Sequence, residues 1–217
     1  MKQKIKRAFS LAEVLLTIII IGSVTALTLP TLKKHSDEAR YVSSVQKAMA
    51  ELASATAQIE LDQGEASTWD FKNKSSTIVN WYKKAMNTVP FPNNKNVWDN
   101  FPFSFMTADG MAWEFTHGNY PCGGGAAIVD VNGPEPPNVR GIDLHGFRIG
   151  HRCGTKDETT GTAPKIGDFG IYAMGDNVND TNNVWACTSY TIKHRKMPWL
   201  YKVPEKIDEI CYAYYGQ

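Results

Sequence analysis

Residues 8–30 read AFSLAEVLLTIIIIGSVTALTLP, and this stretch decides how the rest of the chain is organised. From Phe9 to Leu29 the only ionisable side chain is that of Glu13. A helix of about 20 apolar residues is long enough to cross the hydrocarbon core of a bilayer. The stub in front of the stretch is basic, with Lys2, Lys4, Lys6 and Arg7. Because basic residues stay on the cytoplasmic side, we expect the N-terminus inside and everything after Pro30 outside.

Glu13 distinguishes this stretch from an ordinary membrane anchor. A carboxylate within a membrane helix is costly to insert, so its presence suggests a partner charge, and the segment itself offers none. A cut between Ala8 and Phe9 would create a new α-amine four residues before Glu13. The amine of one copy could then pair with Glu13 of a neighbour, and packed helices would satisfy both charges.

The run Ala8-Phe9-Ser10-Leu11-Ala12-Glu13 followed by apolar residues resembles the prepilin-type cleavage and methylation motif. That motif opens type IV pilins, minor pilins and the pseudopilins of type II secretion. The resemblance implies that a prepilin peptidase cuts before Phe9 and N-methylates it. It also implies that Glu13 corresponds to the family's assembly glutamate.

Three further positions bear on the resemblance. Gly22 and Pro30 fall where the family's helix commonly has a glycine and a proline. Pro30 cannot donate its backbone hydrogen bond, so we expect a helix kink there, with Gly22 as a second such point. Ala8 stands where the family usually has Gly, but because Ala is still small, we expect cleavage to occur.

After Pro30 the sequence stays helical but becomes amphipathic. Apolar residues recur at spacings of three and four from Val42 to Ile59, which predicts a face that docks on a sheet or a partner. A dimeric coiled coil is the alternative, but the stripe is short, which favours docking on its own domain. Gly64 is the expected stop. The expected organisation is a leader peptide (1–8), a transmembrane and assembly helix (9–30), an amphipathic continuation (31–64) and an extracytoplasmic globular domain (65–217).

The remainder predicts one further helix and an antiparallel sheet, and therefore an α+β, pilin-like fold with the long N-terminal helix packed on the sheet. Asp109-Gly110 separates two alternating runs, the pattern of a hairpin. The segment from Val129 to Asp143 also resembles a turn common in pseudopilin-like proteins. The expected elements are a helix over 75–88, strands over 101–106, 111–115, 126–131, 145–149 and 169–174, a strand or helix over 184–193, and a terminal helix over 204–214.

Four cysteines lie beyond the apolar stretch: Cys122, Cys153, Cys187 and Cys211. An even number in an exported domain predicts two disulfides, and no pair has the CxxC spacing of a metal or redox site. Three connectivities are possible. We favour Cys122–Cys153 and Cys187–Cys211, because each closes a local loop.

Composition and motifs argue against other classes of function. The chain has 217 residues and a net charge of +1, which argues against a strongly basic nucleic-acid surface. The short basic cluster Lys193–Lys196 is interpreted as a solvated surface. His145, His151 and Cys153 are close enough in sequence to suggest a zinc or nucleophile site, but Cys153 is expected to be oxidised, no glutamate completes a His-Glu-x-x-His pattern, and an ordinary strand is expected between the histidines. Gly123–Gly125 is a flexible connection, and the oxygen-rich run 176–183 lacks the ligand pattern of a calcium loop.

We therefore expect a structural subunit without a cofactor or metal, and not an enzyme. Its expected partners are a prepilin peptidase, other pilin or pseudopilin subunits, an inner-membrane assembly platform and membrane lipid, but no nucleic acid. It would sit in the inner membrane as a single-pass protein and then enter an extracytoplasmic filament. The sequence leaves open a pilus, a secretion pseudopilus or a DNA-uptake role. One alternative is a secreted domain, because Val24-Thr25-Ala26 resembles a signal peptidase site. The other is a permanently anchored binding module.

Overall fold

The computed structural model describes residues 9–73, 75–90, 103–117, 124–153, 166–175, 185–201 and 210–211. The chain divides into two compact units, residues 1–39 and residues 40–217, and the long helix α1 begins in the first and ends in the second. The helical elements are α1 (Leu11–Gln63), the 3₁₀-helix η1 (Ala66–Thr68), α2 (Ser75–Ala85) and α3 (Ala186–His194). The strands are β1 (Thr88–Val89), β2 (Phe105–Thr107), β3 (Ala112–His117), β4 (Gly125–Asp130), β5 (Leu144–Cys153) and β6 (Ile166–Ala173).

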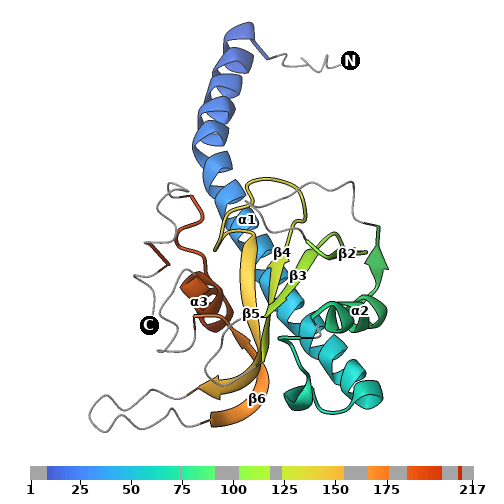
Figure 1. Cartoon of the computed structure of the whole chain (residues 1–217). Helices are drawn as coiled ribbons and strands as arrows, with labels where there is room; N and C mark the ends of the chain where they lie inside the picture. Colours follow the sequence, from blue (N-terminus) through green and yellow to red (C-terminus); the bar gives the residue numbers. More distant parts are fainter. Residues whose placement is uncertain are drawn as a thin grey trace, which may run out of the picture. The chain divides into compact units, whose positions relative to one another are not determined.

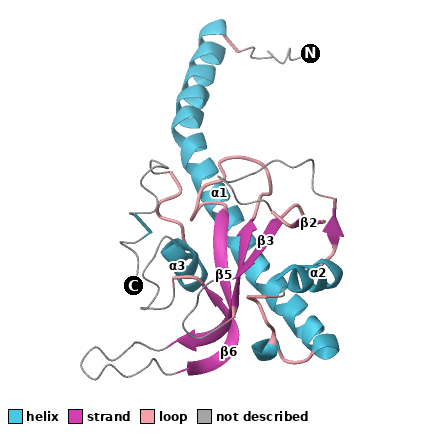
Figure 2. Ribbon diagram, viewed as in Figure 1, coloured by secondary structure: helices cyan, strands magenta, loops and turns pink. Residues whose placement is uncertain are grey.

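The α+β prediction is confirmed: α1 packs on a six-stranded antiparallel sheet. The strands lie in the sheet in the same order as in the sequence, β1-β2-β3-β4-β5-β6 (Figure 1). Each described pair of neighbours is antiparallel. The tight turn from β2 to β3 requires those two strands to be antiparallel, and strands that follow one another in sequence commonly neighbour in a sheet. The sheet and the helices that surround it are seen together in Figure 2.

The second half of α1 buries the amphipathic stripe expected from the sequence. Its inward residues fall at helical spacing, and Val45, Ala48 and Leu52 are fully buried. They join a cluster that includes Trp113 of β3 and Phe147 of β5, which project from the α1-facing side of the sheet. Burial of each large apolar side chain stabilises the fold by about 1.5–3 kcal/mol.

The docked half ends at a glycine and is joined to the sheet by an ion pair. Gly64 ends the helix with a φ of 82°, and its amide donates to Glu60 O at 3.0 Å, as expected for a glycine stop. Nearer the middle of the helix, Lys47 Nζ lies 2.6 Å from Asp109 Oδ2 in the β2–β3 turn. Gly110 in that turn has a φ of 95°, which confirms the Asp109-Gly110 hairpin.

Helix α2 covers the edge of the core beside α1. Tyr82 is fully buried, its hydroxyl lies 2.6 Å from Thr56 Oγ1 of α1, and its ring stacks on Phe115 with centroids 4.2 Å apart. The expected end of this helix near Thr88 is wrong. It ends at Ala85, because the β-branched pair Thr88 and Val89 pairs with β2 instead.

Within the ambiguous stretch 184–193, the residues from Ala186 onward form α3 rather than a strand, and the basic cluster 193–196 lies at its exposed C-terminal end. Cys187 of α3 forms the expected disulfide with Cys211, with Cα atoms 4.8 Å apart. The expected Cys122–Cys153 bond lies outside the described residues, and so does most of the expected terminal helix 204–214. Trp199 Nε1 donates to Gly141 O at 2.6 Å, which ties the segment after α3 to the loop before β5.

Candidate functional site

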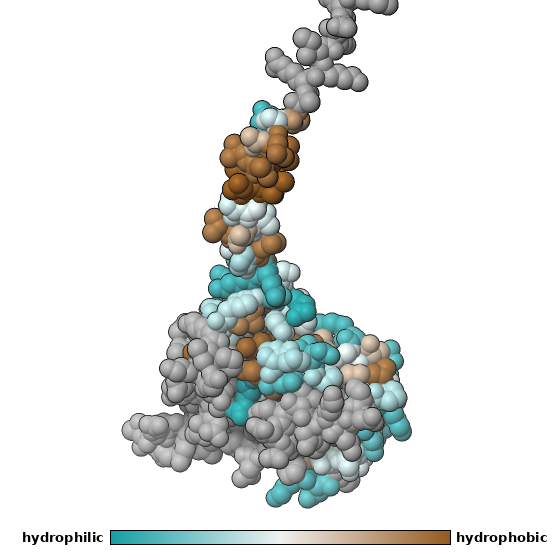
Figure 3. All heavy atoms as spheres, turned by 90° about the horizontal axis from the view of Figure 1, so that it is seen from above, coloured by the Kyte–Doolittle hydropathy of each residue, from teal (hydrophilic) through white to brown (hydrophobic). Residues whose placement is uncertain are grey.

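The described residues leave the first half of α1 without apolar cover. Phe9 is 86% exposed, and the apolar side chains from Leu11 to Leu32 are exposed as well. Figure 3 shows these hydrophobic side chains gathered on the N-terminal part of the helix. Among the described residues, α1 is the single helix long and apolar enough to cross a membrane, and its most apolar window is unburied. An apolar surface of this extent requires lipid or protein around it.

Glu13 has a partner that the sequence reasoning missed. Its Oε2 accepts from the amide of Ser10 at 2.8 Å and from the Ser10 hydroxyl at 2.9 Å, while its own amide donates to Ser10 Oγ at 3.2 Å. This reciprocal arrangement is a capping box, which satisfies amides at the start of the helix. The signal was present in the sequence as Ser-x-x-Glu before an apolar run. The partner is a hydrogen-bond donor rather than a charge, so a neighbouring amine can still pair with the carboxylate.

The other residues that the sequence predicts for cleavage and assembly are placed as follows. Phe9 precedes the first turn of α1, and Ala8 lies outside the described residues. Helix α1 continues through Pro30, and a Cβ added to Gly22 would meet no atom within 4 Å. The expected kink at Gly22 and Pro30 stays a prediction. The open space around Gly22 leaves room for a close neighbour.

The histidine pair does not form one site. His145 is fully buried; its Nε2 lies 3.1 Å from Ile142 O, and its Nδ1 lies 3.2 Å from Thr188 Oγ1. A carbonyl only accepts, so Nε2 donates and Nδ1 accepts in the neutral ring. Burial lowers the pKa of His145 to about 4, which keeps it neutral. His151 lies six residues along β5, roughly 20 Å away at the rise of a strand.

Of the other candidate sites, Gly124 and Gly125 of the glycine run serve close packing, and the rest lie outside the described residues. Gly124 has a φ of 96°, and a Cβ there would collide with the backbone of Ile149. Gly125 is pressed against the Phe71 ring, so both glycines are required for close packing rather than for a flexible connection. The side chain of Cys153 and the run 176–183 are outside the described part of the chain. Within that part, no three His, Cys, Asp or Glu side chains are grouped to hold a metal.

The turn between β4 and β5 holds two buried carboxyl groups that the sequence did not single out as a pair. Asp143 accepts from the amides of Asn138 and Val139 at 2.7 and 2.6 Å. Asp130 accepts from the Asn132 amide at 3.2 Å and, in the side-chain orientation that satisfies its hydrogen bonds, from Asn138 Nδ2 at 2.9 Å. Burial, with the nearby Asp143 carboxylate, raises the pKa of Asp130 to about 8.

These two carboxyl groups organise the turn between β4 and β5. Both are fully buried, and their acceptor oxygens are directed at amides of the 130–143 segment itself. Burial also raises the pKa of Asp143, although the amide hydrogen bonds oppose the shift. The pair therefore fixes the path of the chain from β4 to β5.

Among the features described, the exposed apolar half of α1 with its Ser10–Glu13 cap is the strongest candidate for a functional surface. The architecture as a whole, a long helix whose first half is apolar and whose second half packs on an antiparallel sheet, is pilin-like. Comparison with protein-family models, with curated proteins and with solved structures finds no match to this chain.

Proposed function

We propose that this protein is a structural subunit of a type IV pilus-like or type II secretion pseudopilus filament. A prepilin peptidase would cleave it before Phe9 and methylate the new amine. Before assembly it would be held in the inner membrane through residues 9–30, with its globular domain outside. An inner-membrane assembly platform would then transfer it into the filament, where the apolar halves of neighbouring α1 helices pack together.

The observation that carries the proposal is the division of α1 into an exposed apolar half and a docked half. A helix that served only the globular domain would need no exposed apolar extension. One that served only as an anchor would need no carboxylate near its start. Glu13 lies at the N-terminal end of the apolar surface, one turn from Phe9, where an amine created by cleavage would emerge. The Cys187–Cys211 disulfide suits an oxidising, extracytoplasmic location.

The experiment that tests this proposal is the intact mass of the mature protein from its native host, followed by peptide mapping of its N-terminus. The expected result is a chain that begins at N-methyl-Phe9 and is recovered in sheared filaments or in a membrane assembly complex. A Glu13→Ala variant should be processed and should insert normally, because the glutamate is not at the cut bond. It should fail to join the filament, because the neighbour's amine then lacks its partner.

Two other functions give different results in the same experiment. A mature chain that begins at Leu27 would identify Val24-Thr25-Ala26 as a signal peptidase site and make the protein a secreted domain. An uncut chain that stays in the membrane, whatever residue stands at position 13, would make it an anchored binding module. Either outcome would overturn the proposed filament role.

A further inference from the structure

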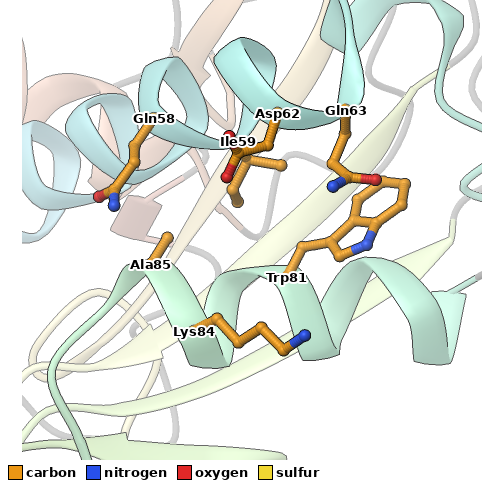
Figure 4. A pocket seen from close by; sticks show the side chains of 7 residues that line it. All are labelled: Gln58, Ile59, Asp62, Gln63, Trp81, Lys84 and Ala85. Carbon is orange, nitrogen blue, oxygen red and sulfur yellow. The ribbon is translucent and has the colours of Figure 1, made fainter.

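A hollow of about 250 Å³ lies in the second unit, between the last turns of α1 and helix α2. Figure 4 shows the side chains of Gln58 and Gln63 extending from α1 toward α2, with the Asp62 carboxylate beside Ile59 on α1. Trp81 faces them from α2, and Lys84 lies one turn further along that helix. The hollow is small compared with the roughly 300–1,000 Å³ that hold drug-sized ligands, so it suits one or two small rings.

The polar groups around this hollow are not used by the fold. Within the described part of the chain, the side chains of Gln58, Asp62, Gln63 and Lys84 make no hydrogen bond or ion pair, and neither does Trp81 Nε1. Nearby polar groups behave differently. Glu60 Oε1 accepts from the Ala66 amide at 2.9 Å, and Trp69 Nε1 donates to Gly64 O at 3.0 Å. The hollow is therefore lined by the exposed side chains of Gln58, Asp62, Gln63 and Lys84, and the amides of Gln58 and Gln63, which extend toward α2, are open to a ligand.

The indole of Trp81 gives the hollow a fixed aromatic wall. Its ring packs edge-on against Trp69, with centroids 5.4 Å apart and planes at 66°, and it borders the main core. Trp69 is itself buried and contacts Tyr82, so the orientation of Trp81 is set by the core. An aromatic face that is held in place presents an apolar surface at little entropic cost.

We infer that this hollow binds a neutral saccharide of one or two units. The apolar face of a sugar ring would stack on Trp81, and its hydroxyl groups would match the mixed donors and acceptors of Gln58 and Gln63. Asp62 and Lys84 carry opposite charges, so the site has no net charge and selects against strongly charged ligands. The site lies in the globular unit, so the inference does not depend on the proposed filament role.

The test uses the full chain in dodecylphosphocholine micelles, because a glycoside detergent would compete for the site. N,N′-diacetylchitobiose and cellobiose are titrated by calorimetry, with sorbitol as a polyol that lacks a ring face. At least one disaccharide should bind saturably with a millimolar dissociation constant, and sorbitol should not bind. A preference between the two disaccharides reports whether the N-acetyl group is recognised.

Variants then locate the binding. Trp81→Ala should weaken it about tenfold, the effect of losing one aromatic contact. Gln63→Leu should also weaken it, and because Gln63 is exposed, this second variant keeps the test valid if Trp81→Ala unfolds. Leu61→Ala, on the same helix end but outside the hollow, should bind as the parent does. The inference is overturned if neither disaccharide binds, if sorbitol binds equally, or if Gln63→Leu binds as tightly as Leu61→Ala.

Discussion

In its first half α1 leaves the apolar residues from Leu11 to Leu32 exposed, whereas in its second half it buries those from Tyr41 to Ile59. The backbone is helical throughout, so secondary structure does not distinguish the two halves. The two halves differ in how their apolar side chains are distributed around the helix. The first half is apolar all round, and the second has a single apolar stripe with polar residues beside it.

The two distributions of apolar side chains require different surroundings. A stripe of limited width can be covered by one face of a sheet, and Val45 and Leu52 share one buried cluster with Trp113 and Phe147 of the sheet. A helix that is apolar on every side must be surrounded, by lipid or by several neighbours. Substitutions in the two halves should therefore have separable consequences, on folding in one case and on membrane insertion or assembly in the other.

The largest effect on folding is expected from Leu52→Ala in the docked half. Leu52 is fully buried, and its truncation should lower the free energy of unfolding by about 2–5 kcal/mol. Leu61→Ala is the matched control, because Leu61 lies on the same helix but is 88% exposed. Leu16→Ala, in the apolar half, should likewise leave the domain unaffected.

These variants are measured by urea unfolding of the full chain in micelles, followed by near-ultraviolet circular dichroism of the core tryptophans. A loss in Leu16→Ala comparable to that in Leu52→Ala would show that the two halves are not separable. The distinction on which the proposed function is based would then be lost.

A smaller loss is expected when the disulfide is removed from the globular unit. The Cys187–Cys211 bond closes a loop with a sequence separation of 24, which corresponds to a contribution of about 3 kcal/mol. The double variant Cys187→Ser/Cys211→Ser should therefore unfold at lower urea concentration than the parent. Under reducing conditions the parent should lose most of that difference, and a variant as stable as the oxidised parent would contradict the prediction.

Much of the fold follows from local signals in the sequence. The start of α1, its glycine stop at Gly64 and the Asp109-Gly110 hairpin each depend on a few adjacent residues, and each is found where expected. The end of α2 was misplaced, because Thr88 and Val89 are drawn into the sheet by a partner strand further along the chain. The helix and strand propensities of residues 75–89 contain no information about the strand with which Thr88 and Val89 pair.

The contacts that depend on distant segments could not be predicted. His145 is bonded to Thr188, 43 residues away, and Asp130 reaches the Asp143 turn only once β4 and β5 have paired. Thr188 lies in the stretch that fits both strand and helix, so its position was open. The Ser10–Glu13 cap is different, because its Ser-x-x-Glu spacing is visible in the sequence. The prediction of a charged partner for Glu13 left out this local hydrogen-bond partner.

Raising the pH from 6.5 to 8 should lower the free energy of unfolding by about 2 kcal/mol, because Asp130 loses its proton in the folded state. Its pKa is about 8 in the fold, above the ordinary value of 3.8, so the folded state holds a proton that the unfolded state has lost. Its contribution to stability is present at low pH and is lost as pH rises toward 8, with a slope of at most about 1.4 kcal/mol per pH unit. Below pH 6.5 His145, with its lowered pKa, acts in the opposite direction.

In the window from pH 6.5 to 8 the opposing effect of His145 is absent, and Asp130 titrates beside Asp143, whose pKa burial also raises. The parent should lose stability across this window, and Asp130→Asn, which resembles the protonated carboxyl group, should show a flatter profile. Glu135→Gln, in the exposed part of the same turn, is the matched control and should follow the parent. Urea unfolding at several pH values measures the slopes, and equal slopes in Asp130→Asn and the parent would show that Asp130 is not the group that titrates.

The smallest expected effect concerns the start of the apolar half, where a cap and a charge are held by the same residue. Ser10→Ala removes the cap but keeps the carboxylate, whereas Glu13→Gln keeps an acceptor for Ser10 but removes the charge. Ser10→Ala should reduce the hydrogen-exchange protection of the first-turn amides about fivefold, the effect of a lost N-cap. Glu13→Gln should change that protection less, because glutamine also completes a capping box.

Neither variant should alter the unfolding of the globular unit, which has its own core. If the protein enters a filament as proposed and Glu13 acts there through its charge, Ser10→Ala should still be incorporated and Glu13→Gln should not. The reverse pattern would show that the order of the helix end, rather than an ion pair with a neighbour, is what assembly requires.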